Sequence, residues 1–399
     1  QSSGGKGGGG GSVTTTTYNY SVSFAVAFCE GNSRVTLGRV WADGTLLDTE
    51  GLDVAFYPGS DTQPRDTTIA GIEGASNTPA FRGITYLVFK DLPLADFGNR
   101  IPSITAEIIK PLEEPDPDSI EELIEGVNLI PASGEAAYAT TPTVVDDGFG
   151  NAVPQNVNLS RSQSNIENSM DNLSKQLPNN SGVNVVISWF GTDLRLSDCE
   201  IKPKVELKNS TDRQLLPINW RVNGLTRSSP QIEAVTTDAD DNPAYGGTPA
   251  DFSVVEAIQR IANVDEDDVY FYPFILMDVE AGNTLPNPYD GGSPGQPVYP
   301  WRGRITTSLP SVDTTAGAQT EMNSFMGSVA RTDFSASGTT INYTGAANDF
   351  GYRRFILHYA HLCAATALTL DNPAKFKAFY IGTEMRSEEH TSELQSLLI

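Results

Sequence analysis

The sequence contains few of the residues that build metal centres and disulfide frameworks. Its 399 residues include three cysteines and three histidines. Cys29, Cys199 and Cys363 lie far apart and form no CxxC pair, which argues against a disulfide scaffold or a zinc site. We expect these thiols to be small buried hydrophobes, because free cysteine is commonly buried. We predict neither a metal nor a cofactor.

Basic residues are also scarce. The chain has 26 Lys and Arg against 50 Asp and Glu, a formal net charge of -24. Such a surface would repel a phosphate backbone over most of its area. Nucleic acid is therefore not an expected partner.

Long hydrophobic runs are absent as well. The longest, 355–370, is interrupted by His358 and His361 and is shorter than the roughly 18 residues of a membrane span. Residues 1–17 lack the charged and apolar regions of a signal peptide. No membrane insertion is expected. The chain does have 39% hydrophobic residues, with 17 Phe, 14 Tyr and 4 Trp, which is enough apolar material for packed cores.

Both ends of the sequence are expected to lie outside folded domains. The run GGKGGGGG at 4–11 lacks the Lys-Ser/Thr ending of a phosphate loop, so residues 1–17 are interpreted as a flexible linker. At the other end, RSEEHTSELQS at 386–396 resembles a reading frame of a common sequencing adapter. Residues 386–399 are therefore interpreted as read-through without a function, and the chain as a truncated piece of a longer protein.

Residues 18–110 have the composition of a β-rich module. β-branched and aromatic residues are dense in several short runs, which Gly, Asp, Asn and Pro clusters separate. The expected strands cover 13–29, 37–48, 53–57, 84–90 and 104–109, and one helical turn is possible at 69–74. No long helix is required here.

The character of the sequence changes at 111–164. PLEEPDPDSIEELIEG begins with prolines and continues as a short acidic amphipathic helix, with Ile120, Leu123 and Ile124 on one side. An extended strand and a Gly- and Asn-rich loop are expected over 134–159. We interpret 111–164 as an acidic, Pro-rich junction between two domains.

Helices and buried strands alternate over 165–385. The apolar run 183–191 (VNVVISWFG) is typical of a strand buried on both faces of a parallel sheet. This rhythm predicts right-handed βαβ units and a parallel sheet or barrel. The other expected strands cover 268–278 and 376–383, a short strand at 219–222 could join the same sheet, and helices are expected at 165–177, 254–261 and 350–368.

These segments resemble a known family over nearly the whole chain. Residues 4–109, with YNYSVSFAVAFCEG, GRVWADG and YLVFKDLPLADFGNRIP, resemble the N-terminal hub region of phage tail-tip attachment proteins. Residues 165–385, with VVISWFGTDLR, YPFILMD, YPWRGRI and FYIGTEMR, resemble the glycoside-hydrolase TIM-barrel-like domain of gene transfer agent baseplate hub proteins. The family's barrel continues for several strands beyond Glu384.

The resemblance implies an α+β multidomain protein, with a β-rich N-terminal hub module followed by an incomplete (β/α)8 TIM-barrel-like domain. It further implies a structural component of a virion tail or gene transfer agent particle, made in a bacterial cytoplasm and involved in host attachment and delivery. The expected partners are other tail and baseplate proteins, copies of the same chain in a ring, and cell-wall glycan. The alternative is a glycoside hydrolase that acts on peptidoglycan or polysaccharide through the TIM-like domain.

Two acids follow expected strands at the positions where barrel enzymes keep their working residues. Glu384 follows FYIGT and Asp278 follows YPFILM. Glycoside hydrolysis requires two carboxylates, so both are candidate catalytic residues. For Glu384 the alternative is a helix cap or a pair with Arg386, and for Asp278 it is the start of a turn.

Aromatic and arginine side chains are candidates for binding a sugar, because an aromatic ring suits the apolar face of a pyranose. Trp189, Trp301 and Arg302 are the predicted substrate-binding residues. The alternatives are core packing for Trp189 and pairing with surplus acids for the arginines. Weaker candidates are Phe190, Tyr272, Tyr299, Arg195 and Arg304.

The two histidines of the expected helix at 350–368 are not assigned to a site. His358 and His361 share one side of that helix with Arg354. No third ligand accompanies them, so we expect a solvated helix face.

Overall fold

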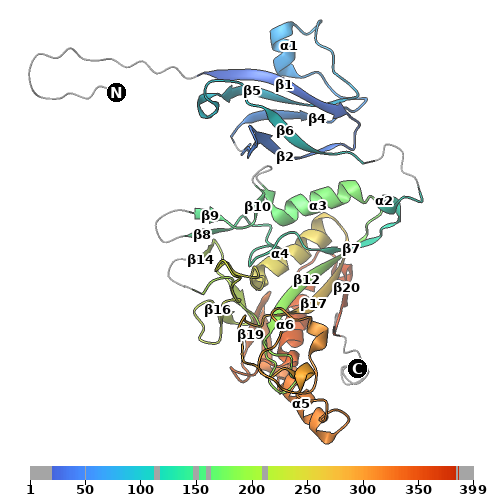
Figure 1. Cartoon of the computed structure of the whole chain (residues 1–399). Coiled ribbons are helices and arrows are strands. Elements are labelled where there is room, and N and C mark those ends of the chain that lie inside the picture. Colours follow the sequence, from blue (N-terminus) through green and yellow to red (C-terminus); the bar gives the residue numbers. More distant parts are fainter. Residues whose placement is uncertain are drawn as a thin grey trace, which may run out of the picture. The chain divides into compact units, whose positions relative to one another are not determined.

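The computed structural model describes residues 20–49, 51–111, 117–146, 152–158, 163–208, 214–382 and 385. The chain divides into two compact units (Figure 1). The first comprises 1–114 and 159–162, and the second comprises 115–158 and 163–399. The expected linker at 1–17 and the expected read-through at 386–399 lie outside the described residues.

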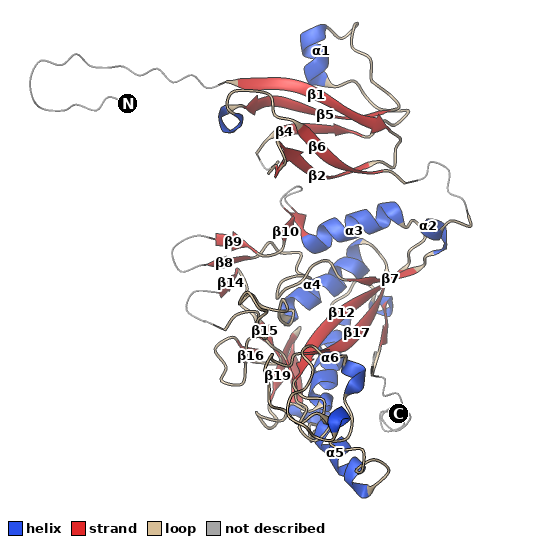
Figure 2. Ribbon diagram, in the orientation of Figure 1, coloured by secondary structure: helices blue, strands red, loops and turns tan. Residues whose placement is uncertain are grey.

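Two three-stranded antiparallel sheets form the first unit (Figure 2). One sheet has the order β1-β5-β4 and the other β3-β2-β6. Their strands are β1 (Ser21–Glu30), β2 (Thr36–Ala42), β3 (Thr45–Leu46), β4 (Asp53–Tyr57), β5 (Ile84–Pro93) and β6 (Ile104–Ile109). Two short helices, α1 (Thr67–Glu73) and η1 (Ala95–Phe97), complete the unit. The runs expected at 53–57 and 104–109 are confirmed as β4 and β6.

A small apolar core joins the two sheets. Val40 of β2 is fully buried with Leu87 and Phe89 of β5. The ring of Phe24 in β1 stacks on Phe89 at a centroid distance of 5.0 Å. Cys29, near the end of β1, is exposed, which corrects the expectation of three buried thiols; Cys199 and Cys363 are buried. Cys29 is exposed because β1 turns that face away from the core.

A parallel sheet organises the second unit. β7 (Gly126–Leu129), β12 (Gly182–Gly191), β17 (Asp268–Met277) and β20 (Phe376–Phe379) lie side by side in chain order. Helices separate them along the chain: α3 (Asn165–Gln176), α4 (Asp251–Gln259) with the π-helical turn η2 (Arg260–Val264), and α6 (Tyr352–Ala367). The expected alternation of strand and helix is therefore confirmed.

Shorter elements surround this sheet. The helices are α2 (Ile120–Leu123), η3 (Pro288–Asp290), η4 (Arg302–Arg304), α5 (Ala316–Met326), η5 (Arg331–Asp333) and η6 (Pro373–Lys375). The strands are β8 (Val144–Asp146), β9 (Ala152–Pro154), β10 (Val157–Asn158), β11 (Gln163–Ser164), β13 (Ile201–Lys202), β14 (Gln214–Leu216), β15 (Arg221–Val222), β16 (Leu225–Thr226), β18 (Phe334–Ser337) and β19 (Thr340–Tyr343).

Two sequence expectations about this sheet need correction. β7 lies within the segment interpreted as a junction, yet it pairs in parallel with β12, so the sheet begins before residue 165. Four residues are too short a run to reveal a strand by periodicity. The expected strand at 219–222 contributes only β15, which forms a hairpin with β16 rather than joining the parallel sheet.

The two faces of the parallel sheet differ in burial. Along β17 the side chains alternate strictly between buried and half-buried. The buried face carries Phe271, which contacts the ring of Tyr359 in α6 at 5.1 Å. Trp189 of β12 lies on the same face against Phe355 at 5.3 Å. The opposite face carries half-buried Tyr270, among other residues. The helices therefore cover one face.

The polar side of α6 is buried rather than solvated, which corrects the expectation for that helix. Arg354 is 1% exposed and His358 is fully buried. The Nε2 atom of His358 lies 2.8 Å from the Oδ1 atom of Asp251 at the start of α4. The Arg354 guanidinium lies 4.0 Å from the ring centroid of Tyr343 in β19. The strand just before α6 and the start of α4, which is 107 positions from His358, cover this side of α6. The sequence of the helix alone does not reveal them.

Candidate functional site

The layer at the carboxyl ends of the parallel strands is the natural place for a site. Sheets of this kind bind ligands where the strands end. Two long segments follow these ends, 192–250 after β12 and 278–351 after β17. Their side chains determine what the layer can do.

Asp278 directly follows β17 and is buried. Its carboxylate lies 2.8 Å from the ammonium group of Lys204, and its Oδ1 accepts a hydrogen bond of 2.6 Å from the hydroxyl of Thr236. The backbone N–H of Thr236 also donates to it. Glu233 lies 3.7 Å from the same ammonium group. Both oxygens of Asp278 are thus engaged in holding the segment after β12 against the end of β17.

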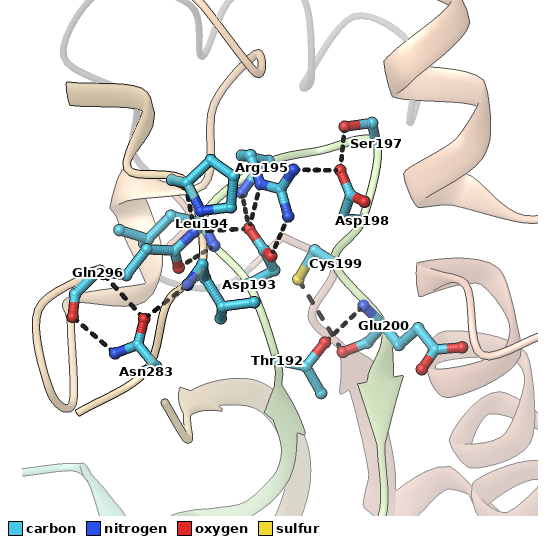
Figure 3. Close-up of polar contacts among 12 residues, drawn as sticks. Thr192, Asp193, Leu194, Arg195, Ser197, Asp198, Cys199, Glu200, Asn283 and Gln296 are labelled. Atoms are coloured by element: carbon cyan, nitrogen blue, oxygen red, sulfur yellow. Dashed lines mark hydrogen bonds and ion pairs between the residues drawn. The ribbon is translucent and has the colours of Figure 1, made fainter. Parts of the chain in front are cut away.

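A second polar cluster fixes the turn after β12 (Figure 3). The carboxylate of Asp193 accepts hydrogen bonds from the Arg195 side chain at 3.0 and 2.7 Å and from Gln296 at 2.8 Å. Asn283 in turn accepts from the backbone of Gln296 at 2.9 Å. Arg195 also pairs with Asp198 at 3.1 Å. The guanidinium of Arg195 therefore pairs with two acids. This is the alternative to sugar binding that the sequence offered for the arginines.

Cys199 lies beside this cluster, as Figure 3 shows. It is buried, and burial raises the pKa of its thiol to about 12. A thiol that stays protonated is a poor nucleophile. Cys199 therefore has a packing role.

A buried ion pair joins the segment after β7 to the hairpin region. Glu135 pairs with Arg227 and accepts a hydrogen bond of 2.9 Å from the backbone N–H of Glu206. Burial raises the pKa of the Glu135 carboxyl, and the charge of Arg227 opposes that rise. The pair anchors the segment around 206 above the strand ends.

Two aromatic side chains lie against Arg302 in this layer, and one of them is exposed. The guanidinium carbon of Arg302 lies 4.3 Å from the ring centroid of Trp301 and 4.8 Å from that of Phe274 in β17. Arg302 is buried, and this burial lowers the pKa of its guanidinium. Trp301 is 52% exposed. A cation stacked on a tryptophan holds the ring flat and leaves its other side accessible.

A second aromatic stack lies in the same layer. Phe190 at the end of β12 contacts the ring of Tyr245 at 5.4 Å, and Tyr245 contacts that of Tyr299 edge-on at 5.6 Å. The hydroxyl of Tyr245 donates to the carbonyl of Met277 at 3.1 Å. We call Tyr245, Phe274, Tyr299, Trp301 and Arg302 the aromatic shelf. The shelf thus consists of two stacks, in which Tyr299 is 40% exposed and Trp301 is 52% exposed.

The structure places the predicted site residues in three different settings. Trp301 and Arg302 lie together on the shelf. Trp189 is fully buried and donates a hydrogen bond of 3.0 Å from its indole N–H to the hydroxyl of Tyr359, so it has the alternative role of core packing. Asp278 is buried and fully hydrogen-bonded. Glu384 lies outside the described residues.

Sequence reasoning did not identify Glu135, Asp193 or Lys204 as parts of this layer. Each is a single charged residue in an irregular segment, where no periodicity marks it. Asp193 and Lys204 follow the apolar run of β12, which is the one signal that could have found them, whereas β7 before Glu135 is too short to give such a signal. In the parts of the chain that the structure describes, no group of three or more His, Cys, Asp or Glu side chains could hold a metal ion. Nor is any helix there long and apolar enough to cross a membrane.

Comparisons with known proteins show a partial likeness to a solved structure. No protein-family model matches the chain, and no curated protein matches it. Among solved structures, a chain of the "Virion of native gene transfer agent (GTA) particle" is 44% identical over 24% of this chain and 22% of that chain, with a TM-score of 0.22. The match thus spans about a fifth of the virion chain. It is a likeness of one segment, and a TM-score this low has no bearing on the fold of the whole.

Proposed function

We propose that this chain is a structural component of a phage or gene transfer agent tail tip, in the baseplate hub that attaches to the host. The main support for this proposal is the order of the two units along the chain. A unit of two antiparallel sheets coincides with the hub-like sequence strings, and a parallel βα unit coincides with the barrel-like strings.

The parallel sheet supports the proposed barrel-like domain. β7, β12, β17 and β20 follow one another in chain order, as successive strands do in a (β/α)8 barrel. Parallel strands are normally covered on both faces. Here the face of β17 with Tyr270 and Tyr272 is half-buried, and Tyr380 beside them is 40% exposed. Such a face fits the inner wall of a barrel.

Electron microscopy of particles tests the proposed role in assembly. Two in-frame deletions in the full-length gene are compared, one of 18–110 and one of 115–385. We expect the first to leave particles without complete tails, because the hub-like unit would make the subunit contacts. We expect the second to leave complete tails with impaired attachment. Complete tails from the first deletion would refute the assignment.

We also propose that the second unit binds cell-wall glycan through the aromatic shelf. The specific observation is Trp301, which is half-exposed and stacks on the guanidinium of Arg302, which also lies over the ring of Phe274 in β17. A flat, supported ring stacks on the apolar face of a sugar. The proposal concerns binding rather than hydrolysis. Glycoside hydrolysis requires two available carboxylates, and both oxygens of Asp278 are engaged with Lys204 and Thr236.

Co-sedimentation of the full chain with purified peptidoglycan tests the shelf. Trp301→Ala should weaken retention roughly five- to tenfold, since an aromatic contact contributes about 1 kcal/mol. Trp301→Phe should retain most of the binding. The control is Ile72→Ala, which removes an exposed apolar side chain from α1 of the first unit. Equal retention of Trp301→Ala and the control would exclude the shelf as the binding surface.

A further inference from the structure

The turn that carries Trp301 also carries a second arginine, Arg304. The backbone N–H of Arg304, the last residue of η4, donates a hydrogen bond of 3.0 Å to the carbonyl of Trp301. Three residues of a 3₁₀ turn rise only about 6 Å, so the two side chains leave the backbone close together. Both are exposed, whereas Arg302 between them is buried. A cation and an aromatic ring therefore reach the solvent from one turn.

Tyr289 of η3 holds Arg304 in place. The ring centroid of Tyr289 lies 4.2 Å from the guanidinium carbon of Arg304. The hydroxyl of the same tyrosine donates a hydrogen bond of 2.7 Å to the backbone carbonyl of Arg304. A guanidinium stacked on an aromatic ring keeps the N–H groups at its edge available to a ligand.

The end of this turn is anchored to the segment after β12. The backbone N–H of Thr306 donates to the carbonyl of Leu194 at 2.8 Å, and that of Leu196 donates to the carbonyl of Thr306 at 2.8 Å. Ile305, between Arg304 and Thr306, is buried. The turn is thus fixed before a ligand arrives, which lowers the entropic cost of binding.

The charge of Arg304 is not neutralised by the protein, although acids are plentiful. The chain has 50 Asp and Glu against 26 Lys and Arg. Arg195, Arg227 and Arg260 each pair with a carboxylate. Among the residues that the structure describes, no ion pair joins Arg304 to an acid. Its guanidinium therefore remains able to pair with an anionic ligand.

We propose that Tyr289 and Arg304 extend the aromatic shelf into a subsite for an acidic sugar, so that the glycan bound there carries a carboxylate. This inference rests on the proposed glycan binding and adds the class of glycan. The Trp301 ring stacks on the apolar face of the sugar, and the Arg304 guanidinium donates two parallel hydrogen bonds to the carboxylate. The excess of acids elsewhere on the chain does not prevent this contact, because physiological salt largely screens exposed charges more than about 8 Å away.

Calorimetric titration of the full chain with two matched probes tests the subsite. One probe is a galacturonic acid hexamer. The other is the same hexamer with its carboxylates methyl-esterified, which keeps the sugar rings and removes the charge. We expect the acid form to bind roughly five- to tenfold more tightly, a preference that raised salt should reduce.

Substitutions of Arg304 identify the source of that preference. Arg304→Gln should abolish it, and Arg304→Lys should keep only part of it, because an ammonium group lacks the planar fork of a guanidinium. The matched control is Arg65→Gln in the first unit. Arg65 is also exposed, and its guanidinium donates a hydrogen bond of 2.8 Å to the carbonyl of Ala75. Its loss should leave the preference unchanged.

Trp301→Ala separates this inference from the proposal on which it rests. It should weaken the binding of both probes by a similar factor, because the ring stacks on the sugar in either form. If it does so while Arg304→Gln leaves the preference intact, the acidic subsite is refuted and the shelf stands. If Trp301→Ala weakens neither probe, the shelf itself is refuted.

Three other results would refute the acidic subsite alone. The first is equal affinity of the unchanged protein for the two probes. The second is retention on peptidoglycan through Trp301 without binding of the acid hexamer. The third is tighter binding of a phosphodiester-linked glycan than of the acid hexamer, which would assign the guanidinium to phosphate.

Discussion

At the scale of single residues, the layer above the parallel strands depends on buried charges that compensate one another. Lys204 and Asp278 come from segments that are far apart in the sequence, and both side chains are almost entirely withdrawn from water. Buried ions are tolerated only when they are paired and hydrogen-bonded. The structure thus explains Asp278 without assigning it to catalysis.

The pair predicts a large loss of stability when either partner is changed. Asp278→Asn should lower the free energy of unfolding of the second unit by about 3 kcal/mol, because it leaves the buried Lys204 ammonium with only Glu233, 3.7 Å away and half-exposed, as its counter-ion. Lys204→Met should have a similar effect. The double variant should lose less than the sum of the two. Urea unfolding of all four proteins measures this coupling.

A matched control shows whether the loss of any carboxylate lowers the stability or only the loss of the buried one. Asp61→Asn removes an exposed carboxylate from the first unit and should stay within about 0.5 kcal/mol of the unchanged protein. If Asp278→Asn were equally mild, the buried pair would not hold the layer together.

At the scale of elements, the turn between η2 and β17 carries an acid whose titration affects stability. Burial, and then the charge of Asp265, raise the pKa of the Asp267 carboxyl to about 6. The Nδ2 group of Asn180 donates a hydrogen bond of 3.1 Å to this carboxyl. A raised pKa means that the folded state binds the proton more tightly than the unfolded state does. The resulting stabilisation is complete below pH ~4 and is lost as the pH rises through about 6.

Asp267→Asn should therefore stabilise the second unit at pH 7 by roughly 1 kcal/mol, a value reduced for solvent screening of a half-exposed group. The advantage over the unchanged protein should shrink between about pH 6 and pH 4. Thermal unfolding of both proteins across this range measures the difference. An advantage that is constant with pH, or one that grows as the pH falls, would contradict the assignment to Asp267.

At the scale of the whole molecule, the two units have separate hydrophobic cores. Val40, Leu87 and Phe89 belong to the core of the first, and a larger cluster that includes Trp189 and Phe355 belongs to the second. Units with separate cores generally unfold separately. We therefore expect two transitions in calorimetry.

Substitutions in each core should move only one transition. Phe89→Ala should destabilise the first unit by about 3 to 5 kcal/mol through the cavity that it leaves. Phe355→Ala should do the same in the second unit. Both side chains are fully buried aromatics, so each variant is the control for the other. A single transition shifted by both variants would show that the units unfold together.

The sequence alone determined the elements with strong local patterns. Runs of β-branched and aromatic residues marked β4 and β6 to the residue, and the apolar run VNVVISWFG marked β12. Helix α6 was predicted within two residues of its observed ends. These elements are recognisable because hydrophobic spacing along a strand or helix is a local property.

Only the tertiary structure determined which distant residues meet. Arg354 and His358 look like a solvated stripe along α6, and they are buried because Tyr343 and Asp251 arrive from other elements. β7 is too short to be recognised and is defined by its pairing with β12. Local periodicity shows which face of an element is apolar. It does not show which residues from elsewhere in the chain will pack against the polar face. Burial and charge compensation arise only when the chain folds back on itself.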